Sequence, residues 1–224
     1  YKINFTQILD QFKFGVTHST GLKNASLYEL YGNIGQKNIN PEKSETNEIF
    51  GEYRFSENIK FSSTAYRTRM KDRIKINSTW DAYENKVPDT TQEGLESELT
   101  FLGKDQNISI ISHFAKSRTA SGGPNSRRPD LSYGVNYFKR LILPKYGPFN
   151  FNISHKFIGD HIDWTGSKNE FVKSVDLVDM SISKNWYNNI ISLNFTNLLN
   201  ERYEKPATYS QNGRELTLNF RRNY

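Results

Sequence analysis

The sequence predicts an all-β fold, a transmembrane antiparallel up-and-down β-barrel wall of about eleven strands. Three observations lead to this prediction. Apolar and polar residues alternate in runs of about ten residues, the length that a tilted membrane-spanning strand requires. The connections between runs are alternately short and long, as between periplasmic turns and extracellular loops. The sequence also closes on such a run, 214–224, with an aromatic last residue, which is common for a strand that closes a barrel wall.

The composition fits a barrel better than a soluble core or a disordered chain. Hydrophobic residues make up 35% of the sequence and the mean hydropathy is -0.74, which is poor for a soluble core. Aromatic residues reach 14%, more than disordered chains carry. No window approaches about 18 consecutive apolar residues, so no transmembrane helix is predicted. The absence of cysteine excludes disulfides, thiolate metal sites and cysteine nucleophiles.

The charge pattern is that of a solvated, mixed-charge surface. The net charge is +6 and the isoelectric point about 9.3, which together with many aromatics could indicate a nucleic-acid partner. Lysine and arginine are scattered, however, and they mix with 24 acidic residues. We therefore predict no nucleic-acid partner.

Each predicted strand shows apolar residues at alternate positions, as in Leu95, Leu99 and Phe101 against Glu96 and Glu98. The predicted strands are 11–20, 46–56, 60–70, 93–102, 107–116, 131–140, 149–157, 178–182, 191–195 and 214–224. Turn residues predict short connections at 57–58, 103–106, 144–147 and 188–189. Long loops are predicted at 21–45, 71–91, 117–129, 160–173 and 201–212.

Several segments resemble TonB-dependent outer-membrane receptors. The stretches 26–33 and 40–45 resemble a block found late in these receptors, and 197–204 (Asn-Leu-Leu-Asn-Glu-Arg-Tyr-Glu) resembles their penultimate-strand motif. The ending that begins at 213 (Gly-Arg-Glu) is similar to theirs. The end of the sequence also resembles the signal that the barrel-assembly machinery recognises. The residues that carry this likeness are Gln211, Gly213, Leu216, Leu218, Phe220 and Tyr224. Within the family, the likeness is greatest to vitamin B12 receptors and their iron-siderophore cousins.

The resemblance implies a barrel of 22 strands with a plugged lumen. Residues 1–224 would form the C-terminal half of that barrel, and the plug, the TonB box and the first half of the wall would lie outside them. The expected function is active transport of a scarce, bulky nutrient, of the vitamin B12 or iron-siderophore or haem type, across the outer membrane of a Gram-negative bacterium. The implied partners are outer-membrane lipid, the barrel-assembly machinery and the TonB–ExbB–ExbD complex, reached through the plug. No cofactor and no enzymatic activity are expected.

Aromatic and basic residues in the predicted extracellular loops are the candidate ligand-binding residues, because tyrosine and tryptophan combine a flat apolar surface with a polar tip. An interfacial aromatic girdle is the alternative for the aromatics, and we favour it for Tyr203. An arginine pair could attract an anionic siderophore or a lipopolysaccharide phosphate, or be ordinary rim charge. The candidates are Tyr28, Tyr31, Trp80, Tyr83, Arg127, Arg128, Trp164 and Tyr209.

Enzymatic and metal sites have weak support in the sequence. The four histidines lack metal-ligand spacing, and Glu96 and Glu98 share the polar face of a strand, where lumen charge is expected. The acidic clusters 81–84 and 160–163 could hold a hard cation, although solvated loop charge is favoured. Two alternatives stay open: an outer-membrane barrel enzyme such as a lipase or protease, and a soluble β-rich module that binds nucleic acid or glycan.

Overall fold

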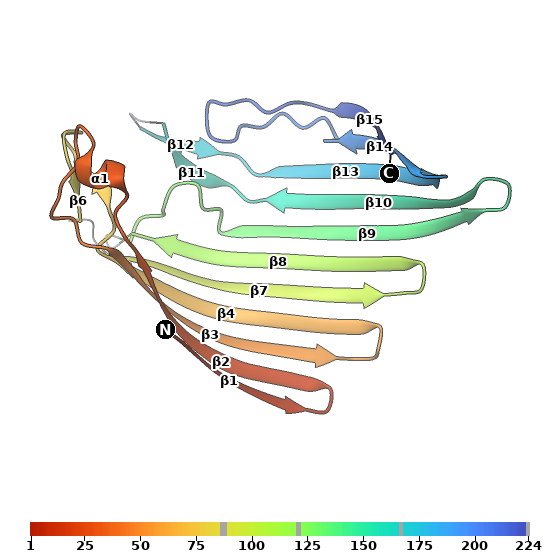
Figure 1. The fold of residues 1–224 in the computed structure, drawn as a ribbon, viewed down its shortest axis with the longest axis horizontal. Coiled ribbons are helices and arrows are strands. Elements are labelled where there is room, and N and C mark those ends of the chain that lie inside the picture. Colours follow the sequence, from red (N-terminus) through yellow and green to blue (C-terminus); the bar gives the residue numbers. More distant parts are fainter. Residues whose placement is uncertain (86–88, 120–121, 166–167, 223–224) are drawn as a thin grey trace. The chain divides into compact units, whose positions relative to one another are not determined.

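Eleven strands form one sheet within the described residues of this computed structural model, which are 1–85, 89–119, 122–165 and 168–222 (Figure 1). Neighbours in the sheet follow one another along the chain, so the sheet has the up-and-down order that was predicted. The strands are β1 (Lys2–Leu9), β2 (Phe12–Lys23), β3 (Glu42–Arg54), β4 (Ile59–Lys71), β7 (Thr90–Leu102), β8 (Gln106–Arg118), β9 (Leu131–Leu143), β10 (Gly147–Ile158), β13 (Val175–Trp186), β14 (Asn189–Thr196) and β15 (Glu215–Arg222).

Strand β1 was missing from the predicted strands. Its alternation is short and ends in the adjacent pair Ile8 and Leu9, which hides the period of two. The register nevertheless places apolar residues of β1 opposite apolar residues of β2, as in Phe5 opposite Val16 and Leu9 opposite Phe12. Cross-strand pairs of this kind stabilise a sheet.

Small elements lie in the connections that were predicted as irregular loops. Helix α1 (Leu27–Tyr31) is short, and a capping box between Ser26 and Glu29 starts it. Strands β5 (Lys75–Ile76) and β6 (Tyr83–Glu84) form one hairpin, and β11 (His161–Trp164) and β12 (Asn169–Val172) form another. The prediction that 160–173 is a plain loop was therefore wrong, because a strand of four residues is too short to show its period in sequence.

The alternation of short and long connections is confirmed. Among the short turns, the one at 187–188 lies one residue before the predicted position, and Tyr187 adopts a left-handed conformation there (φ 51°). The long connections are 24–41, 72–89, 119–130, 159–174 and 197–214. Among the described residues, no helix is long and apolar enough to cross a membrane.

The two faces of the sheet differ in polarity, as the β14–β15 ladder shows. Leu193 lies opposite Leu218 on one face, and Asn194 lies opposite Thr217 on the other. The apolar face is exposed, with Leu218 at 72% of its maximal accessible surface. Buried hydrophobic residues in the described part of the chain are Ile74, Ala115, Val172, Val175 and Ala207. An exposed apolar face of this kind is the one that a barrel wall presents to lipid.

The chain divides into two compact units. The first comprises 1–51, 64–95 and 115–125, and contains the β1–β2 pair, α1 and the β5–β6 hairpin. The second comprises 52–63, 96–114 and 126–224, and contains the strands from β9 to β15 with the β11–β12 hairpin. The candidate site lies within the second unit.

Candidate functional site

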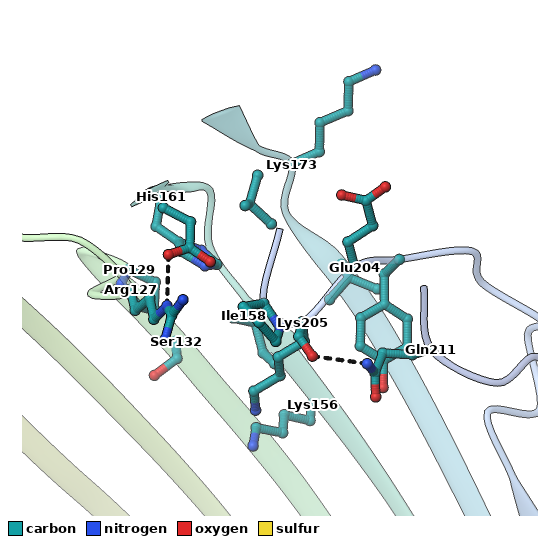
Figure 2. Close-up of a pocket in the computed structure, with 15 residues that line it drawn as sticks. Arg127, Pro129, Ser132, Lys156, Ile158, His161, Lys173, Glu204, Lys205 and Gln211 are labelled. Carbon is teal, nitrogen blue, oxygen red and sulfur yellow. Dashed lines mark hydrogen bonds and ion pairs between the residues drawn. The ribbon is translucent and has the colours of Figure 1, made fainter. Parts of the chain in front are cut away.

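An open cavity of about 700 Å³ lies among the long connections of the second unit (Figure 2). Its walls come from the start of β9, the end of β10, the β11–β12 hairpin, the start of β13 and the connection 197–214. The lining residues are Arg127, Pro129, Ser132, Lys156, Ile158, His161, Asp163, Val172, Lys173, Val175, Tyr203, Glu204, Lys205, Pro206 and Gln211. The size is that of a small-molecule site.

A buried carboxylate joins three connections around this cavity. The side chain of Asp163, in β11, is only 1% exposed. Its Oδ1 accepts hydrogen bonds from Arg127 Nε at 2.6 Å and from the Trp164 backbone N–H at 2.7 Å. Its Oδ2 accepts one from the Ala207 backbone N–H at 2.9 Å. A buried charge needs such partners, so Asp163 holds Arg127 and Ala207 against the β11–β12 hairpin.

The hydrogen bonds also decide the ionisation of Asp163. Burial by itself raises the pKa of this carboxyl group, because it disfavours the charged form. The hydrogen bonds from Ala207, Arg127 and Trp164, together with the charge of Arg127, outweigh burial, and the net effect lowers the pKa. Asp163 is therefore a carboxylate at neutral pH.

Arg127 is held by its backbone as well as by its side chain. Its backbone N–H donates to the Ile162 carbonyl at 2.8 Å, next to the ion pair with Asp163. The residue is left-handed, with φ of 61°, which costs on the order of 1 kcal/mol for a residue other than glycine. The two contacts to β11 offset that cost.

The receptor-like motif at 197–204 has a structural role next to the cavity. Asn197 is left-handed (φ 51°) and 3% exposed. Its Nδ2 donates to the carbonyls of Glu201 and Asn212, at 2.9 and 3.2 Å, and its Oδ1 accepts the Glu201 N–H at 2.9 Å. The side chain thus joins the two ends of the connection 197–214, as an amide with both donors and an acceptor can.

The predicted assembly-signal residues divide between the cavity and the last strand. Gln211 lies in the cavity wall, where its Nε2 donates to the Lys205 carbonyl at 2.8 Å (Figure 2). At Gly213 a Cβ would lie 2.6 Å from Asn200 Oδ1, an atom that accepts the Arg214 N–H. Three of the others, Leu216, Leu218 and Phe220, lie exposed on β15, whereas Tyr224 lies outside the described residues.

Of the predicted ligand-binding residues in the second unit, Arg127 lines the cavity. Trp164 uses its backbone N–H for Asp163 while its side chain is exposed, and Tyr209 is exposed as well. Arg128 adjoins Arg127 and is not among the lining residues. Tyr203, for which the sequence favoured a place in the interfacial girdle, lines the cavity.

Two of the predicted ligand-binding residues in the first unit contact each other. The rings of Tyr28, in α1, and Tyr83, in β6, meet edge to face at 6.3 Å. Tyr31 has the Lys37 ammonium 5.9 Å from its ring centroid, and Trp80 occupies an exposed left-handed turn. A cavity of about 390 Å³ also lies in this unit, and none of these four aromatic residues lines it.

One carboxylate of each acidic cluster, Asp81 and Asp163, accepts hydrogen bonds from within the protein. Asp81 accepts hydrogen bonds from Asn77 Nδ2 at 2.6 Å and from Thr79 Oγ1 at 2.7 Å, which lower the pKa of its carboxyl group. Asp163 makes the contacts described above. Within the described ranges, no three of the histidine, aspartate and glutamate side chains gather where a metal ion could bind.

Lysines distinguish the cavity, and sequence reasoning did not single them out. Lys156 lies on β10, where its strand neighbours are Gly134 and Leu177. Lys205 lies in the connection 197–214 and Lys173 between β12 and β13. The polar-face position of Lys156 was visible in the alternation of its strand, but nothing local indicated that Lys205 would reach the same cavity.

Comparison with known proteins identifies the family. The family model described as "TonB dependent receptor-like, beta-barrel" matches residues 1–198, so the chain belongs to the TonB-dependent receptor β-barrel family. The vitamin B12 transporter BtuB of Vibrio cholerae serotype O1 is 24% identical over 221 residues, which cover 95% of this chain and 35% of that protein. The chain thus spans about a third of the length of the curated relatives that it matches.

Solved structures of iron receptors share the fold. The siderophore receptor PirA from Acinetobacter baumannii has a TM-score of 0.81 at 17% identity, over 98% of this chain and 40% of that one. The ferric yersiniabactin uptake receptor FyuA from Yersinia pestis has a TM-score of 0.79 at 16% identity, over 100% and 36%. The FrpB iron transporter from Neisseria meningitidis has a TM-score of 0.77 at 13% identity, over 98% and 38%. At such identities the likeness shows the fold alone.

Proposed function

We propose that residues 1–224 form the C-terminal half of the barrel of an active-transport receptor in the outer membrane of a Gram-negative bacterium. Its substrate is a scarce, bulky nutrient of the vitamin B12 or iron-siderophore or haem type. The cavity around Asp163 carries the proposal, because it is a recess of ligand size built by the long connections of a wall of this family. The named relatives, a vitamin B12 transporter and iron receptors, support the nutrient class.

In this proposal the chain supplies a wall and a binding surface. The loops capture the nutrient, and the polar face of the sheet lines the path that it takes. Energy reaches the receptor from the TonB–ExbB–ExbD complex through a plug that these residues do not include. The plug then rearranges, and the nutrient enters the periplasm. No covalent step is required, and we propose none.

The first test is the coding sequence upstream of Tyr1. We expect the reading frame to continue through a signal peptide, a plug and about eleven further strands. A start codon directly before Tyr1 would contradict the proposed domain organisation.

The second test is uptake by the complete receptor. A strain that lacks it should lose growth on a limiting ferric siderophore or on vitamin B12, and the complete gene should restore growth only when the TonB system is intact. Growth that depends on the receptor but not on TonB would contradict energised transport. Fractionation should place the protein in the outer membrane, with the heat-dependent gel mobility of a folded barrel.

A further inference from the structure

We infer that the cavity around Asp163 binds a negatively charged group of the transported nutrient, so that the receptor prefers an anionic metal chelate to a corrinoid without net charge. The inference rests on the proposed function and deepens it, because it names the chemical class of ligand that this cavity takes.

The charge balance of the cavity wall is positive. Four cationic side chains line it, those of Arg127, Lys156, Lys173 and Lys205. Two carboxylates, Asp163 and Glu204, line it as well, which leaves an excess of two positive charges. A cavity wall with a net positive charge raises the local concentration of anions.

Internal contacts engage both oxygens of Asp163 and one oxygen of Glu204. Asp163 pairs with Arg127 and accepts two backbone N–H groups, as described above. Glu204 Oε2 accepts the Thr208 backbone N–H at 2.7 Å. Among the described residues, no ion pair within 4.0 Å joins an acidic group to Lys156, Lys173 or Lys205. The ammonium groups of these three lysines are therefore available to pair with a ligand.

Two of the lysines point into the same part of the cavity. Figure 2 shows the Lys156 and Lys205 side chains directed to the region below Ile158, whereas the end of Lys173 points away from the other side chains. The residues directly opposite Lys156 on β9 and β13 are Gly134 and Leu177, so neither neighbouring strand places a carboxylate directly opposite it. The diagonal neighbour on β13, Asp179, accepts the Asn197 backbone N–H at 2.8 Å. Lys156 and Lys205 are thus the pair that an anion would contact.

The wall that carries this pair is held in place before any ligand arrives. Lys205 donates its backbone N–H to the Tyr209 carbonyl at 3.0 Å and accepts the Gln211 side chain at its own carbonyl. Two residues further on, Ala207 is bound to Asp163. Holding the loop in advance reduces the entropy that binding costs. The apolar side chains of Ile158, Val172 and Val175 complete the recess and accommodate the uncharged body of a bulky ligand.

The test uses the complete receptor, purified in detergent, and three probes of different charge. The probes are a ferric tris-catechol complex, which is strongly anionic, ferrioxamine B, which is cationic, and cyanocobalamin, which has no net charge. Binding is measured by fluorescence quenching at low and high salt. The test variant is K156Q/K205Q, and the control is K104Q/K145Q, which removes the same charge from the turns before β8 and β10.

We expect the anionic complex to bind best and to lose affinity as salt rises. K156Q/K205Q should weaken it roughly tenfold, the effect of two partly screened ion pairs, whereas K104Q/K145Q should leave it unchanged. Heat-dependent gel mobility verifies that both variants fold.

Two results would overturn the inference and leave the proposed function standing. One is that cyanocobalamin or ferrioxamine B binds more tightly than the anionic complex. The other is that K156Q/K205Q binds the anionic complex as the unaltered receptor does. If none of the three probes binds, the inference fails, and the uptake test described above decides separately whether the proposed function stands.

Discussion

Arg127 Nε lies 2.6 Å from Asp163 Oδ1, although 36 residues separate the two in sequence. The guanidinium group is largely exposed, while the carboxylate is buried. The pair is therefore a buried acceptor that a largely exposed cation and two backbone N–H groups satisfy together. The pair lies where three connections that line the cavity meet.

Replacing Asp163 by asparagine should loosen the connection 197–214. An amide nitrogen cannot accept the Ala207 N–H, so one of the three hydrogen bonds becomes unfavourable. We expect local opening to become easier by about 1–3 kcal/mol, measured as faster hydrogen exchange at the Ala207 amide. Asp160→Asn, at an exposed position outside the cavity wall, is the control. Equal exchange in both variants would show that Asp163 does not hold the connection.

The same contact should persist down to acidic pH. The pKa of Asp163 is lower in the folded protein than in an unfolded chain, so its stabilising effect is complete above the unfolded pKa of about 3.9. The effect is lost only as the pH falls through the lower, folded pKa. Exchange protection of the Ala207 amide, corrected for intrinsic rates, should therefore be the same at about pH 7 and pH 5. Loss of protection between those values would contradict this assignment.

Gly213→Ala should impair folding of the last strand. The added Cβ would lie 2.6 Å from Asn200 Oδ1, which must then move and release the Arg214 N–H. At Gly123 a Cβ would meet Thr119 Oγ1 at an ordinary 3.6 Å, so Gly123→Ala is the matched control. The readout is the folded fraction after refolding into detergent, without the assembly machinery. Normal refolding of Gly213→Ala there, with poor assembly in cells, would point to the recognition signal instead.

Asn197→Ala should destabilise the second unit. It removes three side-chain hydrogen bonds and leaves a left-handed alanine in a buried position. We expect a loss of about 2–4 kcal/mol, seen as a lower Tm of the purified receptor. Asn188→Ala, in an exposed turn, should change Tm little. A similar Tm for both variants would mean that the motif matters for some reason other than these contacts.

Arginine substitutions on β15 should distinguish its two faces. At Leu218, on the apolar face, arginine should cost about 2–4 kcal/mol if the position lies near the middle of the bilayer. At Thr217, opposite Asn194 on the polar face, it should be tolerated. The measurement is the yield of folded protein in the outer membrane. The reverse ranking would exchange the lipid and lumen faces assigned to this strand.

Much of the strand pattern was predictable because alternation is local. Ser192, Leu193 and Asn194 show the two faces of β14 without knowledge of any partner strand. The hairpin of β11 and β12 was not predictable in this way, since strands of four residues contain too few repeats. The resemblance to TonB-dependent receptors identified 197–204 and Gly213 as motif residues but did not explain their role. Asn197 forms hydrogen bonds with its side chain, and Gly213 closely approaches Asn200. Only the tertiary structure shows these contacts.

The sequence by itself determined the architecture of this protein, because a period of two and the spacing of turns are properties of neighbouring residues. It also indicated the family, through motifs that lie close together along the chain. Only the tertiary structure decided the candidate site. Asp163 meets Arg127 and Ala207 across 36 and 44 residues, and Lys205 joins Lys156 at one cavity. Such contacts depend on how the long connections fold back on one another, which no local pattern encodes.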